Sequence, residues 1–177
     1  MRIVGGSLRG RVLNEFRDKG VRPTSDMARE SLFNILRFKV VDCAFLDLFA
    51  GTGAVGIEAF SRGAKSVWLN DFSNESIALI TKNLEKLGVK EKIKLTKQNA
   101  LIFLQTVGEK FDVVYVDPPY KADFKVQVLG LAKDVLTEDG IIVLEDEQFL
   151  EHNIEGLVEY DRRKYGRVHL TFLRLEK

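Results

Sequence analysis

Apolar stretches alternate along most of the chain with segments whose apolar residues repeat at helical spacing. We expect five of these stretches to form buried strands: residues 43–49, 66–70, 92–97, 111–116 and 141–146. Between the second and third strands, apolar positions from Ile77 to Leu87 predict a helix that Ser73 caps and Gly88 ends. Further helices are expected over residues 54–62, 99–104 (with Asn99 as its cap) and 124–136.

The two ends of the chain have other patterns. Residues 2–5 and 9–13 flank a glycine- and serine-rich turn and predict a short hairpin. A helix follows whose apolar face consists of Ala28, Leu32, Ile35 and Leu36. The last stretch lacks a helical period and predicts two strands around Tyr165 and Gly166. The alternation between these ends predicts a parallel sheet covered by helices on both faces, with ligands bound at the carboxyl ends of its strands.

Length and composition are those of one ordinary soluble domain. A chain of 177 residues can bury a sizeable core, and it contains a single cysteine, Cys43, and two histidines. We therefore expect neither disulfides nor a metal. No apolar run approaches a membrane span and the start lacks the apolar stretch of a signal peptide, so we expect a cytoplasmic protein. We also expect a monomer.

Charge is unevenly distributed along the chain. Residues 1–40 contain nine Lys and Arg against four Asp and Glu, whereas the remaining residues contain 18 against 22. A basic front on a mildly acidic body suggests a polyanionic partner. A merely solvated, charged hairpin explains the same distribution.

A glycine-rich loop follows the first predicted strand of the sheet. The segment DLFAGTGAVG contains Gly51, Gly53 and Gly56, a G-x-G-x-x-G pattern that opens a helix. Asp71 lies twenty residues after Gly51, at the end of the next strand, where a carboxylate can accept hydrogen bonds from a ribose. Together they predict a nucleotide-like ligand.

Asp47 indicates which nucleotide that ligand is. It lies four residues before Gly51, where it would repel a pyrophosphate and suit the ammonium group of a methionine moiety. This favours S-adenosylmethionine over NAD, although Asp47 could simply accept hydrogen bonds from loop amides. Asn99 and Ala100, after the third strand, are placed to meet the adenine edge, and a plain helix cap explains Asn99 equally well.

The fourth strand runs directly into Asp117-Pro118-Pro119-Tyr120. The prolines remove backbone donors and stiffen the loop, which leaves the Asp117 carboxylate and the Pro118 carbonyl as acceptors. Two acceptors on the N–H bonds of an exocyclic base amine would activate this poor nucleophile and stabilise its developing positive charge. Tyr120 could stack on the base. The tetrapeptide therefore predicts methylation of a base amine.

Four ordered motifs resemble the bacterial small-subunit ribosomal RNA guanine-N2 methyltransferase family: RIVGGSLRGR, RPTSDMARESLFNIL, DLFAGTGAVGIEA and DPPY. The resemblance covers essentially the whole chain. It implies a Rossmann-like class I methyltransferase domain over residues 41–177, with residues 1–40 as a hairpin-and-helix extension of the same unit. It further implies a mostly parallel seven-stranded sheet with an antiparallel last strand, S-adenosylmethionine as cofactor, and a guanine of 16S rRNA in the small subunit as substrate.

The resemblance also assigns residues by their motif positions. Those assigned to the cofactor are Arg22, Thr24, Asp47, Phe49, Gly51, Gly53, Asp71, Phe72, Asn99 and Ala100. Those assigned to the chemistry are Asp117, Pro118, Pro119 and Tyr120. The sequence departs from the family at Asp71, where relatives often have Glu, at Ser73, where a second acid is frequent, and at Asn99, where Asp is common in the superfamily. These departures bear on cofactor affinity more than on the reaction.

Two other functions stay open from the residues. A DNA adenine methyltransferase can share the DPPY chemistry, although 177 residues leave no room for a large target-recognition domain. A nucleotide-binding module without transfer activity would use the tetrapeptide as a turn. If RNA is the substrate, we expect Arg9 and Arg11 on the hairpin to contact it. A second contact is expected from the C-terminal basic run of Arg162, Arg163, Lys164 and Arg167.

Overall fold

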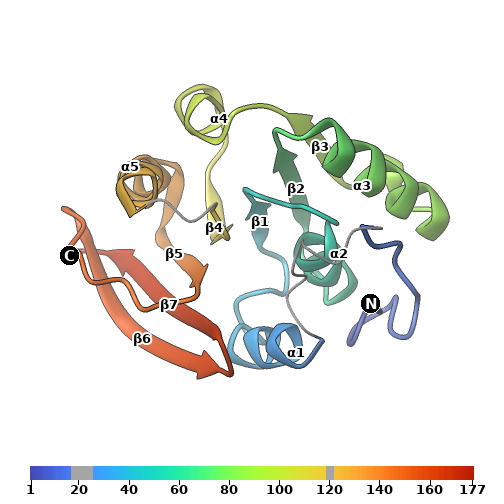
Figure 1. Cartoon of the computed structure of the whole chain (residues 1–177), viewed down its shortest axis with the longest axis horizontal. Coiled ribbons are helices and arrows are strands. Elements are labelled where there is room, and N and C mark those ends of the chain that lie inside the picture. The colour runs from blue at the N-terminus through green and yellow to red at the C-terminus, as the bar shows by residue number, and fades with distance from the viewer. Residues whose placement is uncertain (17–25, 119–121) are drawn as a thin grey trace.

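A seven-stranded sheet forms the centre of the molecule, and helices cover both of its faces (Figure 1). The computed structural model describes residues 1–16, 26–118 and 122–177. The strands are β1 Ala44–Asp47, β2 Ser66–Asp71, β3 Lys94–Lys97, β4 Phe111–Val116, β5 Leu136–Asp146, β6 Leu157–Tyr165 and β7 Val168–Leu175. The helices are α1 Asp26–Ile35, α2 Ala54–Ser61, α3 Asn74–Leu87, α4 Ala100–Thr106 and α5 Ala122–Ala132, with short 3₁₀ turns at Lys90–Lys92 and Lys133–Val135.

The strand order is β3-β2-β1-β4-β5-β7-β6. The first five strands pair in parallel, and β7 runs antiparallel between β5 and β6. This confirms the predicted mostly parallel sheet with an antiparallel last strand. The chain moves outward from β1 to β3 and then returns to place β4 on the other side of β1. Such a reversal of strand order opens a crevice at the carboxyl ends of β1 and β4, where ligands bind in sheets of this kind.

Each face of the sheet has its own apolar core. On one face, Phe45 and Val113 pack with Leu32 of α1, Ile57 of α2 and Ile80 of α3. The other face packs against α4 and α5 through residues that include Leu46, Val114, Phe103, Val128 and Leu129. Strand residues buried on both faces explain why the sequence shows continuous apolar runs rather than alternation. Among the residues that the structure describes, no helix is both long and apolar enough to cross a membrane.

The N-terminal hairpin is much less regular than the sequence predicts. Its two arms share one isolated bridge, between Arg2 and Val12. The turn between them bonds to the end of α2 instead: the backbone N–H groups of Ser7 and Leu8 donate to the carbonyl (2.7 Å) and the hydroxyl (2.9 Å) of Ser61. The arms still exchange backbone hydrogen bonds, from the Ile3 N–H to the Arg11 carbonyl (2.9 Å) and from the Leu13 N–H to the Met1 carbonyl (3.1 Å), and they stay short because the N–H groups of Val4 and Gly5 donate to a side chain of α2 instead.

A buried carboxylate fastens the first residues of the chain to α2. Glu58, fully buried, accepts hydrogen bonds from the backbone N–H groups of Val4 (2.9 Å) and Gly5 (2.8 Å) and from Arg62 Nε (2.7 Å). Its other charged neighbour is Arg29 of α1, with 3.5 Å between Nε and Oε2. These bonds, together with the buried side chain of Ile3, join the front of the chain to the sheet domain.

The boundary between α5 and β5 differs from the prediction. The helix ends at Ala132 rather than Leu136, and β5 begins at Leu136, five residues before the expected start. Leu136 pairs with Phe111, after which the register shifts so that Ile141 pairs with Val113. Gly140 lies within this irregularity, and a Cβ there would come 2.8 Å from the Phe111 carbonyl oxygen. Gly140 thus permits close approach of two strands and does not end a helix.

Candidate active site

The glycine loop joins β1 to α2, and two of its glycines have left-handed backbone. Gly51 has φ of 56° and Gly53 of 80°, a conformation that other residues rarely adopt. A Cβ at Gly51 would meet no protein atom within 4 Å, which leaves open space beside the backbone for a ligand. At Gly56, in contrast, a Cβ would lie 2.1 Å from Leu69 Cδ2. The third glycine therefore serves the packing of α2 on β2.

Asp71 holds the glycine loop against the end of β2. Its Oδ2 accepts a hydrogen bond from the Gly51 N–H (2.9 Å), and its Oδ1 accepts one from the Ser73 N–H (2.8 Å). The residue is half-buried. A carboxylate has about four acceptor sites, so Asp71 can still accept hydrogen bonds from a ligand while it positions the loop.

Asp47 lies beneath the same loop, at the end of β1. It is only 1% exposed, and its Oδ2 accepts a hydrogen bond from the Gly56 N–H (3.0 Å). Burial raises the pKa of Asp47 to about 7; the Gly56 bond opposes the rise, and repulsion from Asp71 and Glu145 adds to it. The loop-amide role considered from the sequence is thus observed, and it leaves a buried carboxyl group whose ionised form a nearby cation would stabilise.

Three acids belong to one face of the sheet on neighbouring strands. Asp47 of β1 pairs with Tyr115 of β4, which pairs with Val143 of β5. Side chains two residues apart on a strand share a face, so Asp117 and Glu145 continue this row toward the carboxyl edge. The Tyr115 hydroxyl donates a hydrogen bond to Glu145 Oε2 within it. A row of acids at the crevice favours a positively charged ligand.

Asp117 and Pro118 lie directly after β4, beside this row. Asp117 is exposed at the mouth of the site, yet the protein around its carboxyl group removes part of its hydration. This desolvation, followed by repulsion from Glu145, Asp47 and Asp146, raises the pKa of Asp117 well above its ordinary value, and Lys125 opposes the rise. Pro118 is buried. Pro119 and Tyr120, predicted to act with them, lie outside the described residues.

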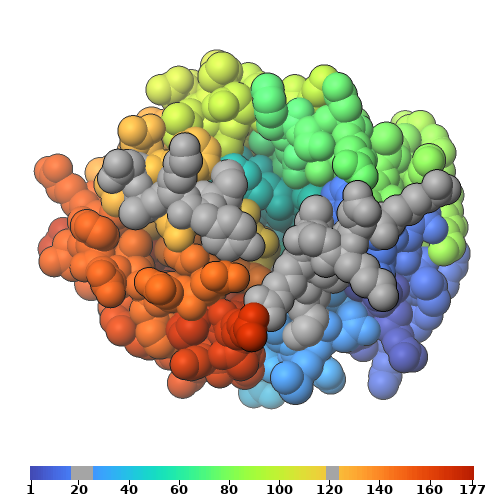
Figure 2. Space-filling model, viewed as in Figure 1, coloured from blue at the N-terminus to red at the C-terminus, as the bar shows by residue number. Residues whose placement is uncertain are grey.

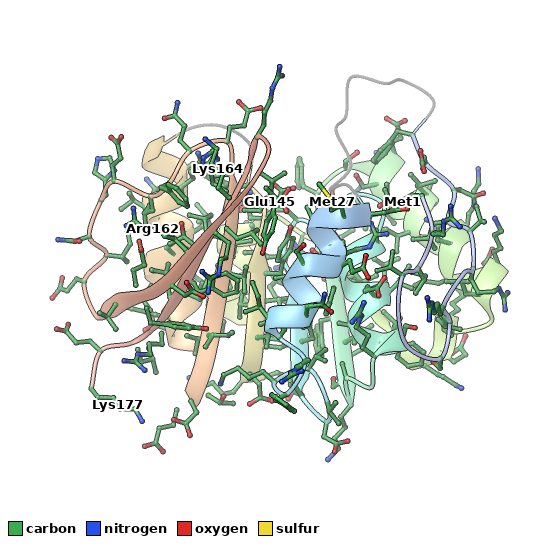
Figure 3. The ribbon with its side chains drawn as sticks, turned by 90° about the horizontal axis from the view of Figure 1, so that it is seen from below. Met1, Met27, Glu145, Arg162, Lys164 and Lys177 are labelled. Carbon is green, nitrogen blue, oxygen red and sulfur yellow. The ribbon has the colours of Figure 1, made fainter. Side chains whose placement is uncertain are left out.

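A depression of about 50 Å³ adjoins these two residues. It is lined by Asp117, Pro118, Glu145, Asp146, Glu147, Arg167 and Val168. The lining thus comes from the ends of β4 and β5 and from the turn between β6 and β7. Figure 3 shows that Glu145 of β5 and Lys164 of β6 lie toward the same edge of the molecule, and that Lys177 lies at the opposite edge.

The residues predicted to meet adenine follow β2 and β3, which are neighbours in the sheet. Phe72, directly after Asp71, is 71% exposed. Asn99 caps α4, because its Oδ1 accepts hydrogen bonds from the N–H groups of Leu101 (3.0 Å) and Ile102 (3.4 Å). Ile102 is 51% exposed on that helix. Exposed apolar side chains beyond adjacent strands offer surfaces on which a flat ring can pack.

Other predicted cofactor residues are placed less directly. Phe49, in the glycine loop, is half-buried with its ring edge-on to Phe124 at 6.0 Å. Ala100 is 5% exposed as the first residue of α4. Arg22 and Thr24 lie outside the described residues. No group of three or more acidic, cysteine or histidine side chains arranged to hold a metal occurs in the described ranges.

The two basic regions predicted to contact RNA, the N-terminal arginines and the C-terminal basic run, lie at different ends of the molecule. Arg11 donates a hydrogen bond to the Lys86 carbonyl (3.2 Å) at the C-terminal end of α3. That helix has 14 residues, about 20 Å at 1.5 Å per residue, and its other end adjoins Asp71. Arg9 bonds through its N–H to Gly6, in the turn that packs on the end of α2. Arg9 and Arg11 therefore lie far from the carboxyl edge of the sheet.

The C-terminal basic run, in contrast, surrounds the turn between β6 and β7, at the carboxyl edge. Arg162 and Arg163 form ion pairs with Glu159 (2.5 Å) and Asp161 (3.0 Å). Lys164 and Arg167 adjoin the turn and are exposed. Figure 2 shows the carboxyl-edge face, with the C-terminal strands (orange to red) on one side, the N-terminal segment (blue) on the other and the glycine-loop region (teal) between them.

Sequence reasoning missed two residues of this site. Glu145 ends a predicted strand, and nothing local distinguishes it from an ordinary terminal acid; its partnership with Asp117 depends on strand order. Ile102 reads as an apolar helix residue, and only its exposure marks it. Arg167 was assigned to RNA binding in general, and the structure places it in the wall of the depression beside Asp117.

The fold and this site define a methyltransferase of the Rossmann-like class. The family model described as "Conserved hypothetical protein 95" matches residues 1–174, and the chain belongs to that family. Ribosomal RNA small subunit methyltransferase D of Escherichia coli (strain K12) is 37% identical over 149 residues, which cover 83% of this chain and 75% of that protein.

Solved structures agree with this assignment. The Escherichia coli protein yhhF has a TM-score of 0.88 and 33% identity, and the match covers 99% of this chain and 98% of that one. SMU.776, solved as a complex with SAH, has a TM-score of 0.73 and 14% identity over 92% of this chain and 53% of that one. The second likeness is one of fold.

Proposed function

We propose that this protein transfers the methyl group of S-adenosylmethionine to the exocyclic N2 amine of a guanine in 16S rRNA of the small ribosomal subunit. The observation that carries the proposal is the adjacency of β1 and β4: the glycine loop leaves one strand, and Asp117-Pro118 leaves the other. A cofactor on the loop and a target amine at Asp117 would then meet at one crevice. Membership in a family with a small-subunit rRNA methyltransferase supports the RNA substrate.

The residues around the loop fit S-adenosylmethionine. The open space at Gly51 admits a ligand, Asp71 retains acceptor capacity for ribose hydroxyls, and Phe72 with Ile102 offers apolar surface for adenine. The buried Asp47 suits the ammonium group of the methionine moiety. When bound, this cofactor supplies an electrophilic methyl group on a positively charged sulfur. We assign the same cofactor role to Phe49, Gly53, Asn99, Ala100, Arg22 and Thr24, by their motif positions.

The chemistry at the target amine falls to Asp117 and Pro118. An exocyclic amine shares its lone pair with the base, so its nitrogen is a weak nucleophile. The Asp117 carboxylate and the Pro118 carbonyl would accept its two N–H bonds, favour a tetrahedral nitrogen and stabilise the charge that develops there. Asp117 must be ionised to do this fully. Tyr120 would stack on the base and Pro119 would stiffen the loop.

The basic residues would position the RNA by phosphate contacts, while the pocket checks the base. Lys164 and its neighbours on β6 are near the target site, and Arg9 and Arg11 would touch a more distant part of the same RNA. The base must be turned out of its stack to reach Asp117.

The decisive experiment offers labelled S-adenosylmethionine together with one of three acceptors: small subunits from a strain that lacks the enzyme, free 16S rRNA, or DNA. We expect label in the subunit RNA, recovered as N2-methylguanosine after digestion and mass spectrometry. Label in DNA as N6-methyladenine would favour the adenine methyltransferase. No transfer, with NAD co-purifying, would favour the nucleotide-binding module.

A further inference from the structure

The depression beside Asp117 has an unusual arrangement of hydrogen-bonding groups. Carboxylates form one side of it, and the guanidinium-bearing Arg167 contributes from the β6–β7 turn. Its lining therefore offers both acceptors and a donor, the groups with which the edge of a base forms hydrogen bonds. Because it adjoins Asp117 and Pro118, any base whose amine lies at those acceptors presents its neighbouring ring atoms to this depression.

The acids that line the depression are not equivalent. Asp146 forms an ion pair with Lys125, and its other oxygen accepts a hydrogen bond from the Glu147 N–H (2.7 Å). Glu147 is exposed beyond it. Glu145 is only 8% exposed, lies on the strand next to Asp117, and is oriented by the Tyr115 hydroxyl. A carboxylate has about four acceptor sites, so Glu145 can serve more than one donor at a time. Because Val116 pairs with Leu144, Glu145 follows β5 where Asp117 follows β4, and it is a buried acceptor on the strand next to the target acceptors.

We propose that Glu145 and Arg167 select guanine as the target base: Glu145 accepts the N1–H and Arg167 donates to O6. This inference rests on the proposed function. With N2 at Asp117 and Pro118, the next ring position of guanine carries N1–H, a donor that requires an acceptor. The position after it carries O6, an acceptor, and Arg is the side chain that most often contacts guanine O6 and N7 in nucleic-acid complexes. Enzymes that extrude a base commonly check it through this edge.

Adenine would be rejected by the same pair. If its amine lay at Asp117 and Pro118, the adjacent ring nitrogen N1 would be an acceptor facing a carboxylate. Two acceptors would then face each other and repel, and adenine has no carbonyl oxygen to accept from Arg167. A site built to bond a particular N–H and a particular carbonyl oxygen rejects analogues that lack them. The arrangement thus separates guanine from adenine, the base of the competing function.

The test uses the full-length protein with small subunits from a strain that lacks the enzyme. Glu145→Gln and Arg167→Ala are compared with Arg163→Ala, an exposed arginine of the same hairpin that does not line the depression. At saturating cofactor, we expect each of the first two variants to lower kcat/KM for the subunit by about tenfold or more. Arg163→Ala should instead lower affinity in a salt-dependent way, as a phosphate contact does.

Salt dependence separates a base contact from a phosphate contact at Arg167. Arg167→Ala should leave the slope of affinity against salt, and the affinity for S-adenosylmethionine, as in the wild type. A normal kcat/KM for Arg167→Ala, or a slope reduced as for Arg163→Ala, would overturn the proposal; the exposed turn position keeps this variant informative even if Glu145→Gln does not fold. A wild-type product other than N2-methylguanosine would overturn the proposed function itself.

Discussion

The half of the sheet that would bind the cofactor and the half that would bind the target differ in what surrounds their acidic side chains. In the first half, Asp47 and Asp71 accept hydrogen bonds from backbone N–H groups of the loops that they position. In the second, Asp117 has no hydrogen bond within the described residues, and its principal charged neighbours, led by Glu145, are other acids. The cofactor half is therefore held in shape by its own amides, whereas the target half keeps acceptor capacity for a ligand.

The comparison shows how one sheet edge can serve two tasks. Hydrogen bonds to backbone amides make the glycine loop rigid before any ligand arrives, which lowers the entropic cost of binding. At the target side, desolvation and neighbouring acids disfavour the ionised carboxyl group of Asp117, so this group is stabilised most when a cation or an N–H donor approaches. Asp47 has the features of both halves: it accepts a hydrogen bond from the Gly56 N–H, and its pKa is nevertheless raised.

The largest effect should follow removal of the target acceptor. Asp117→Ala is expected to lower the single-turnover rate of methyl transfer by about 10²–10³-fold, as loss of one preorganised charge-stabilising group does. Asp117→Asn keeps one acceptor oxygen and should retain a larger rate than the alanine variant. Rapid-quench assays at saturating cofactor measure both. A near-normal rate in Asp117→Ala would leave Pro118 as the sole acceptor and remove the contrast between the halves.

The pH dependence of the transfer rate should also depend on Asp117. Because the pKa of Asp117 is raised and its ionised form is the better acceptor, the transfer rate should increase with pH and level off once Asp117 is ionised. Glu145→Gln removes the strongest repulsion and should move the midpoint to lower pH. Glu138→Gln, at an exposed acid near the other end of β5, should leave the midpoint in place. Identical midpoints in all three proteins would contradict the acid row.

The next effect is on the free energy of unfolding, through Asp47 in the cofactor half. Asp47 has its pKa raised from 3.8 to about 7. Below pH 3.8 the group is protonated in both states and has no effect on stability. Between pH 3.8 and 7 only the unfolded state ionises, so stability falls as pH rises, and above 7 the loss is complete at about 4 kcal/mol.

Asp47→Asn removes this titration and retains an acceptor for the Gly56 N–H. Denaturant unfolding should therefore find the variant more stable than wild type at pH 8, by at most about 4 kcal/mol, with the gain shrinking toward pH 4. Asp139→Asn, at an acid whose side chain is 83% exposed, is the matched control and should show no such pH-dependent gain. Equal pH profiles for the two variants would mean that burial of Asp47 costs nothing.

Most of the fold could be predicted because its signals are local. The glycine loop that opens α2, the Ser73 cap and the Gly88 end of α3 are patterns within a few residues, and these boundaries are confirmed. The predicted start of β5 was wrong because the sequence pattern makes Leu136 the last apolar position of a helix. Only its pairing with Phe111 makes it a strand residue. The acceptor role of Glu145 could not be found because 28 residues separate it from Asp117, and parallel pairing of β4 with β5 brings them together.

A smaller effect is expected at the ribose position. Asp71→Ala should raise the dissociation constant for S-adenosylmethionine about tenfold or more, since hydrogen bonds to a charged acceptor contribute about 1.5–3 kcal/mol each. The loss has two sources, the ribose contact and the Gly51 and Ser73 amides that Asp71 positions. Asp71→Asn keeps one acceptor and should bind more tightly than the alanine variant. Calorimetry that finds wild-type affinity in Asp71→Ala would exclude this residue from the cofactor site.

The smallest effect compares the two basic regions. Arg163→Ala with Lys164→Ala removes charge beside the target half, and Arg9→Ala with Arg11→Ala removes charge at the far end of α2 and α3. Each lost phosphate contact should reduce the slope of log affinity against log salt by about 0.7–0.9. We expect the first pair to reduce it more than the second pair, because Arg163 and Lys164 adjoin the target half, whereas Arg11 lies at the far end of α3. Cofactor affinity should not change in either. If the pair at Arg9 and Arg11 has the larger effect on subunit binding, the RNA extends over the N-terminal segment, and the basic front of the chain is its principal contact after all.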